Sequence, residues 1–280
     1  MRRFAILAAV VLALWLPTVH AAAPVESVRV YAFDCGRLEF KDLGIFSDTG
    51  EYDGVAGTLS EPCFLIRHPK GDLLWDTGLG DRFAATPGGV EVRPGVRYIV
   101  DTPLLKQLQA IGVAPADIEY LSFSHFHRDH TGNANVFVHS TWLLSRREVE
   151  ALEGTPTPVN VNPDDLSGRK QAKVELIDLD RDVFGDGTVK ILRANGHTAG
   201  HQVLQLKLPH AGVVILSGDA VHTRENYELN RMPVFNYARG ETLGSMDRIR
   251  RILARNGGRL VIQHDPRDFE ALPKAPAYLD

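Results

Sequence analysis

Ser124-His125-Phe126-His127-Arg128-Asp129-His130 is the stretch on which the interpretation of this sequence depends. Within six residues it offers four potential metal ligands: His125, His127, Asp129 and His130. The apolar run Ile118–Ser124 predicts a β-strand that leads directly into the first histidine. A loop leaving that strand can turn two ligands toward one metal position and two toward another. Imidazole and carboxylate groups suit zinc and similar ions.

Further candidate ligands follow other predicted strands: His197 after Val189–Ala194, Asp219 after Val213–Leu216, and His264 after Leu260–Gln263. Each is weak evidence alone, because a single histidine after a strand is more often hydrogen-bonded at the surface. Together with the first stretch they make five histidines and two aspartates. That set is large enough for a site with two metal ions.

Segments typical of strands recur in both halves of the chain: Val28–Phe33, Cys63–Arg67, Asp72–Trp75, Val174–Asp178 and Val203–Leu208. We predict a short helix at Leu104–Ile111 and a longer one at Glu241–Asn256, which Gly257-Gly258 would end. Residues 43–62 and 78–98 are rich in Gly, Pro and Asp and are expected to be long loops. We expect a single domain over residues 24–280, with a two-sheet core and helices outside.

Residues 1–23 are typical of a secretory signal peptide. Arg2 and Arg3 precede the apolar run Phe4–Leu16, and Pro17 interrupts it. An uncleaved membrane anchor is the alternative, but the run is shorter than the roughly 20 residues that a bilayer span needs. Cleavage predicts a periplasmic or secreted protein without membrane attachment. It removes two arginines and no acid, so the formal charge changes from −4 to −6.

Composition excludes several classes of protein. The 280 residues are 44% hydrophobic and 24% charged, which is typical of a globular domain. The acidic balance argues against nucleic acid as a partner, since duplex binders need a basic surface. Cys35 and Cys63 are too few for a disulfide framework. They either pair or remain two buried free thiols, and we favour free thiols because the sequence does not place them within bridging distance.

The pattern His-x-His-x-Asp-His, followed by His, Asp and His at strand ends, resembles the metallo-β-lactamase superfamily over essentially all of Val28–Asp280. The resemblance implies an α+β fold, the αββα sandwich of two mixed β-sheets flanked by helices. It also implies a ligand set, in which His125, His127 and His197 hold one metal, Asp129, His130 and His264 hold the other, and Asp219 bridges them.

Within the superfamily the chain is most similar to the N-acyl-homoserine lactonases. The similar stretches are Asp34-Cys35-Gly36, Trp75-Asp76-Thr77-Gly78, Ser124–Gly132, Gly196–Gln202, Asp219–Tyr227 and His264-Asp265-Pro266. This resemblance implies two divalent ions, zinc above all, and a hydroxide between them that opens an acylated lactone. Asp129 would pass the proton to the leaving oxygen. The resemblance also implies a homodimer.

One position departs from these lactonases. They often carry a Tyr three residues after the bridging Asp, with its hydroxyl at the substrate carbonyl, whereas this chain has His222. An imidazole can also donate a hydrogen bond, so we expect His222 either to assist the carbonyl oxygen or to be a solvated loop residue.

Other residues are expected around the site. His201 is interpreted as a partner of the ligands rather than a ligand, and Asp76 as a hydrogen-bonding tie between loops. Apolar side chains in loop-like sequence are candidates for an acyl pocket or for additional core: Phe46, Met232, Phe235 and Tyr237.

Two other functions compete with the lactonase hypothesis. One is a different hydrolase on the same site, acting on a β-lactam, an aryl ester or an organophosphate. The other is a non-catalytic metal-binding protein with a degenerate site, against which the complete ligand set argues.

Overall fold

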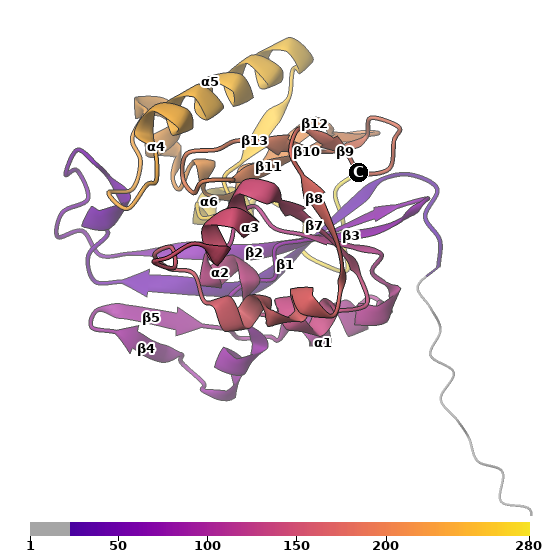
Figure 1. The fold of residues 1–280 in the computed structure, drawn as a ribbon, viewed down its shortest axis with the longest axis horizontal. Helices are drawn as coiled ribbons and strands as arrows, with labels where there is room; N and C mark the ends of the chain where they lie inside the picture. Colours follow the sequence, from indigo (N-terminus) through magenta and orange to yellow (C-terminus); the bar gives the residue numbers. More distant parts are fainter. Residues whose placement is uncertain (1–22) are drawn as a thin grey trace, which may run out of the picture.

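The computed structural model describes residues 23–280 as two β-sheets packed face to face, with helices on both outer sides (Figure 1). The predicted signal peptide, apart from Ala23, lies outside the described residues. Figure 1 shows α4 (Arg224–Leu229) and α5 (Arg239–Asn256) over one sheet and α1 (Leu104–Ala110) under the other. The expected αββα sandwich is confirmed.

The first sheet is mixed and has eight strands. In spatial order they are β4 (Val90–Arg93), β5 (Val96–Ile99), β1 (Arg29–Phe40), β2 (Gly57–His68), β3 (Gly71–Trp75), β6 (Tyr120–Ser122), β7 (Thr141–Ser145) and β8 (Lys173–Ile177). From β3 through β8 neighbouring strands run parallel, whereas β1 pairs antiparallel with both of its neighbours.

The second sheet has five strands: β13 (Arg259–Val261), β12 (Gly212–Leu216), β11 (Gln202–Leu208), β10 (Val189–Arg193) and β9 (Arg181–Asp182). Only β12 and β13 pair in parallel. The remaining α-helices are α2 (Arg128–Thr131), α3 (Arg146–Glu153) and α6 (Pro266–Glu270). Within residues 23–280, no helix combines the length and the apolar character that a bilayer span requires.

The space between the sheets is the main core. Phe64 and Trp75 of the first sheet belong to the same buried cluster as Ile191, Leu204 and Val214 of the second, and all five are fully buried. Burying a side chain of this size contributes roughly 1.5–3 kcal/mol. This core therefore holds the two sheets together and sets the positions of their strand ends.

Helix α5 covers the outer face of the second sheet. Its buried stripe Met246, Ile249 and Leu253 packs in one cluster with Ile215 of β12. The helix ends at Gly257, whose φ of +60° is the left-handed conformation that glycine adopts most readily at this position. The predicted helix and its glycine cap are both confirmed.

Two segments expected to be loops contain strands. The segment 78–98 includes β4 and most of β5, and the segment 43–62 includes the beginning of β2 at Gly57. The prediction was wrong at β4 because this edge strand is largely exposed and lacks an apolar run. Pro94-Gly95, which suggested an irregular loop, instead forms the turn between β4 and β5.

Cys35 and Cys63 form a disulfide between the neighbouring strands β1 and β2, with their Cα atoms 5.7 Å apart. The expectation of two free thiols was wrong. The antiparallel register sets Phe33 opposite Cys63, which brings the two cysteines close although 28 residues separate them in sequence. Local sequence carries no information on that register.

Replacing both cysteines by serine should lower the free energy of unfolding by about 3 kcal/mol, since the disulfide restricts the unfolded chain. Urea denaturation of the wild type and the double variant measures this difference. A reducing agent should shift the wild-type midpoint and leave the Cys35→Ser/Cys63→Ser midpoint in place. Equal midpoints for the oxidised wild type and the variant would contradict the expectation.

Candidate metal centre

Four strand ends deliver the predicted ligands to one edge of the sandwich. His125 follows β6, His197 follows β10, Asp219 follows β12 and His264 follows β13. The strands β10, β12 and β13 share one direction, because β11 runs antiparallel to both β10 and β12. Their carboxyl ends therefore meet at the same edge, where the histidines after β6 join them.

Asp219 lies at the centre of this cluster. Its Oδ2 is 3.6 Å from His125 Nε2, 3.4 Å from His197 Nε2 and 3.1 Å from His222 Nε2. Its Oδ1 is 3.1 Å from His130 Nε2 and 3.0 Å from His264 Nε2. The two oxygens thus face two different groups of imidazoles, as expected of a bridging carboxylate.

His127 and Asp129 complete the two groups. His127 Nδ1 lies 3.1 Å from His197 Nε2, within the group formed by His125, His127, His197 and Asp219. Asp129 lies with His130 and His264. The structure therefore brings together all seven predicted ligands, in one group of His125, His127, His197 and Asp219 and a second group that contains Asp129, His130 and His264.

A backbone glycine permits the approach of Asp219. Gly218 has a φ of +47°, and a Cβ placed on it would lie 2.5 Å from Ser124 Cβ and 2.7 Å from His201 Nε2. No larger residue fits there without displacing the strand end of β6. The turn after β12 can therefore insert Asp219 between the histidines only because residue 218 has no side chain.

Burial gives the imidazoles of the first group the form that binds metals. It lowers the pKa of His127 to about 4 and holds the pKa values of His125 and His197 well below the usual range. At neutral pH these rings are uncharged and can offer a nitrogen lone pair.

The second group behaves in the opposite way. Burial also opposes the charged form of His264, but the neighbouring Asp219 and Glu61 carboxylates outweigh it and raise its pKa to about 10. The pKa of His130 is raised well above its usual range by Glu61 and Asp219, again against the effect of burial. The carboxylates around these two rings supply negative charge that can stabilise a bound cation.

Asp76 ties three of the converging segments together. Its Oδ1 accepts a hydrogen bond from Ser124 N at 2.7 Å, and its Oδ2 lies 3.1 Å from His130 Nδ1 and accepts from Gln263 Nε2 at 3.0 Å. Asp76 itself is fully buried and has a φ of +58°. It therefore fixes the ring of His130 with its Nε2 toward Asp219.

His201 supports the cluster without facing it as a ligand. Its Nε2 accepts a hydrogen bond from Asp219 N at 2.9 Å, and its Nδ1 lies 3.2 Å from Ala194 O. Burial lowers its pKa to about 3, so the ring is neutral and can accept at one nitrogen while donating at the other. Both ring nitrogens are engaged with the backbone.

Two buried acids were missed by the sequence reasoning. Glu61 in β2 is fully buried, and its oxygens lie 3.7 Å from His130 Nδ1 and 3.4 Å from His264 Nδ1. Glu148 in α3 accepts hydrogen bonds from Gly200 N at 2.6 Å and Phe126 N at 3.2 Å. The sequence around Glu61 carries no distinguishing signal, since the polar residues Thr58 and Ser60 precede it in β2.

The donor set fits divalent metal ions. Among the buried polar atoms without a hydrogen-bond partner in the described residues are His125 Nε2, His130 Nε2 and Asp219 Oδ1. Buried polar atoms are rarely left without partners, and these three belong to the predicted ligands. Imidazole nitrogens and carboxylate oxygens are ligands of zinc and similar ions. Bound ions would satisfy all of these atoms.

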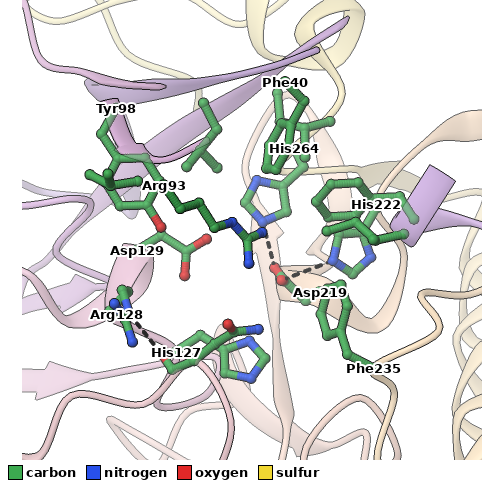
Figure 2. A pocket seen from close by; sticks show the side chains of 16 residues that line it. Phe40, Arg93, Tyr98, His127, Arg128, Asp129, Asp219, His222, Phe235 and His264 are labelled. Carbon is green, nitrogen blue, oxygen red and sulfur yellow. Dashed lines mark hydrogen bonds and ion pairs between the residues drawn. The ribbon is translucent and has the colours of Figure 1, made fainter. Parts of the chain in front are cut away.

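A cavity of about 150 Å³ opens above the cluster (Figure 2). Asp129, Asp219, His222 and His264 form part of its wall, together with Phe46, Phe235 and other apolar side chains. His222 is 1% exposed, so it is not a solvated loop residue. Met232 is 2% exposed and is not part of this wall, and Tyr237 lines a different cavity.

Comparison with known proteins gives consistent results. Residues 56–264 match the family model of the metallo-beta-lactamase superfamily. The N-acyl homoserine lactonase AttM of Azorhizobium caulinodans is 31% identical over 272 residues, covering 90% of this chain and 99% of that protein. An N-acyl homoserine lactonase of a Bacillus species is 26% identical over 224 residues, covering 78% of this chain and 86% of that protein.

Solved structures support the fold. An N-acyl homoserine lactone hydrolase with N-hexanoyl-L-homoserine bound at its catalytic metal center aligns with a TM-score of 0.78. Its identity is 23%, and the alignment covers 91% of this chain and all of that one. The dizinc quorum-quenching lactonase AidC aligns with a TM-score of 0.65 at 19% identity, covering 92% of this chain and 96% of AidC.

Asp219→Asn should lower the metal content of the purified protein, because an amide cannot present two anionic oxygens to two positions. Elemental analysis should give about two divalent ions per wild-type chain and about one or fewer in the variant. Asp247→Asn, which alters an exposed ion pair with Arg251, is the matched control and should keep the wild-type content. If the metal content of Asp219→Asn equals that of the wild type, Asp219 does not bridge the two metal positions.

Proposed function

Because the chain belongs to the metallo-beta-lactamase superfamily, we propose that it opens the lactone ring of N-acyl homoserine lactones and uses two divalent metal ions, preferably zinc. The names of its relatives support the substrate. The observation that carries the dinuclear site is Asp219, whose two oxygens face two separate groups of imidazoles.

In this proposal each group of ligands has its own ion. His125, His127 and His197 would hold one, Asp129, His130 and His264 would hold the other, and Asp219 would be available to both. Bound divalent ions supply a Lewis acid and lower the pKa of water to about 7. The protein supplies the fixed ligand geometry and the closed surroundings.

Asp129 is the acid best placed to handle a proton. It lies beside His130 and His264, lines the cavity, and is only partly buried, unlike Asp219. When the ring opens, the alkoxide that leaves the carbonyl must gain a proton. Asp129 can carry a proton to that oxygen because its carboxylate reaches both the cluster and the cavity.

His222 is the proposed hydrogen-bond donor in the cavity wall. Its ring stacks on that of His264 at 5.3 Å between centroids, and the ring of Phe46 lies 5.2 Å from it. Its Nε2 lies 3.1 Å from Asp219 Oδ2, so Nδ1, which has no hydrogen-bond partner among the described residues, is the nitrogen left to donate. A donor of this kind stabilises charge that develops on that oxygen.

We also propose that the protein works in the periplasm or outside the cell. The signal-like residues 1–23 support this location. The disulfide Cys35–Cys63 supports it independently, because disulfides persist in oxidising compartments and are rare in the cytosol of mesophiles.

A proton-release assay tests the reaction. Metal-loaded protein should release protons from N-acyl homoserine lactones of short and long chain, because each opened lactone gives a carboxylic acid. A β-lactam offered under the same conditions should react much more slowly. Preference for the β-lactam, without opening of either lactone, would overturn the proposed function.

Substitution of His222 tests its role. His222→Ala should lower kcat by roughly 100-fold, the range seen when one donor to a developing oxyanion is removed. His222→Tyr keeps a donor and should retain most of the activity. Metal content should be measured on both variants, so that loss of an ion is told apart from loss of the donor. Full activity in His222→Ala at wild-type metal content would show that His222 is not the hydrogen-bond donor to the substrate carbonyl oxygen.

A further inference from the structure

The cavity above the ligands contains two arginines that the proposed reaction does not use. Arg93 belongs to the edge strand β4, and Arg128 stands between the ligands His127 and Asp129 in sequence. Both arginines line the cavity and both are exposed. Figure 2 shows the side chain of Arg93 extending into the cavity, toward Asp219. A molecule that enters the cavity therefore meets two guanidinium groups.

Within residues 23–280, no acid neutralises either of these guanidinium groups. Many other arginines of the chain do form ion pairs, for example Arg82 with Asp165 at 3.2 Å. Asp129 follows Arg128 directly in sequence and lines the same cavity, but no ion pair joins it to Arg128 or to Arg93. The positive charge of both arginines is therefore available to a bound molecule.

Arg128 is held in a fixed orientation by the segment 158–161. Its backbone N donates a hydrogen bond to Asn160 O at 3.0 Å, and its Nε donates to the same oxygen at 3.3 Å. Asn160 has a φ of +61°, a left-handed conformation that is uncommon for residues other than glycine. The bridge between His127 and Val161 holds the two segments together beside this contact. The terminal nitrogens of Arg128 are therefore oriented before a ligand binds, which lowers the entropy lost on binding.

Tyr98 adds a hydroxyl group to the cavity wall that contains the two arginines. It lines the cavity, and its ring meets that of Phe83 edge to face at 5.4 Å. Burial and the nearby charge of Asp129 raise the pKa of this hydroxyl, so it stays protonated and can donate a hydrogen bond. A guanidinium group binds a carboxylate through paired, charge-assisted hydrogen bonds. Donors of these kinds favour a carboxylate over a neutral group.

A carboxylate can reach this wall from two parts of the substrate. One is created from the carbonyl group when the ring opens, and the other would be carried at the end of the acyl group. The carbonyl faces His222 in the proposed function, and Figure 2 shows His222 and Arg128 on opposite sides of the cavity. Arg93 and Arg128 are therefore placed to meet the acyl group rather than the ring.

We propose that Arg93 and Arg128 bind a carboxylate at the end of the acyl group, so that the protein prefers lactones acylated with a short dicarboxylic acid. The inference rests on the proposed function for the ring and adds the charge of the acyl group. The cavity holds only about 150 Å³, so a short acyl group is sufficient to bring its end to the arginines. Tyr98 donates a further hydrogen bond to the same carboxylate.

Binding of two ring-opened compounds tests this assignment without turnover. Calorimetry on the metal-loaded protein compares N-glutaryl-homoserine with the compound of the same shape that ends in a carboxamide. The glutaryl compound should bind about tenfold more tightly, and this preference should fall as NaCl is raised to about 0.5 M. Arg93→Gln and Arg128→Gln should each reduce the preference, and the double variant should abolish it. Arg97→Gln is the matched control, because Arg97 is exposed on β5, donates to Gly88 O and lies outside the cavity wall.

Several results would overturn the assignment: equal affinities for the two compounds, no binding of either, a preference that survives in the double variant, or an effect of Arg97→Gln as large as that of Arg128→Gln. N-hexanoyl-homoserine has only the carboxylate of the opened ring. If the double variant weakens its binding as much as that of the glutaryl compound, the arginines bind the ring carboxylate and the assignment is wrong.

The proton-release assay on the same preparations separates this inference from the proposed function. A carboxylate preference that the double variant loses, in a protein that opens no lactone, would reject the proposed function and support the arginine site. Opening of neutral acylated lactones, without a preference for the glutaryl compound, would keep the proposed function and reject the arginine site.

Discussion

The carboxylate of Asp219 is the group around which the rest of the site is arranged. It is 3% exposed, and imidazole nitrogens of five histidines lie within 3.6 Å of its two oxygens. A buried carboxylate without compensation is strongly unfavourable. The surrounding histidines hold the pKa of Asp219 well below its usual range despite burial, so the aspartate remains an anion on which cations can converge.

That convergence depends on elements far from the site. The apolar core between the sheets aligns β6 of one sheet with β12 and β13 of the other, and the ligands simply follow these strands. Buried acids then set the orientation of the rings, as Asp76 does for His130. Glu61 adds a carboxylate with no hydrogen-bond partner in the described residues, beside His130 and His264. Such a group is tolerable where a cation lies nearby.

The ligands could be predicted from sequence because they follow apolar strands, and strands that run in the same direction, such as β10, β12 and β13, bring their carboxyl ends to one edge. The β4–β5 pair could not, since short exposed edge strands lack the apolar pattern that identifies β6 or β12. The disulfide depended on the register of β1 against β2, which is a long-range property. Glu61 was overlooked because its place in the site depends on His130 and His264, which are close to it in space and distant in sequence.

The candidate ligands and the walls beside them are built from different parts of the chain. The ligands stand on strand ends fixed by the core, so changes that move them would also disturb the packing of the two sheets. A neighbouring cavity of about 410 Å³, which His127 and His197 also line, is walled largely by the segment 154–161 and by Phe235 and Tyr237, which lie outside the sheets. Loops of this kind tolerate substitution more readily than strands. The wall of this cavity can consequently change without altering the ligand geometry.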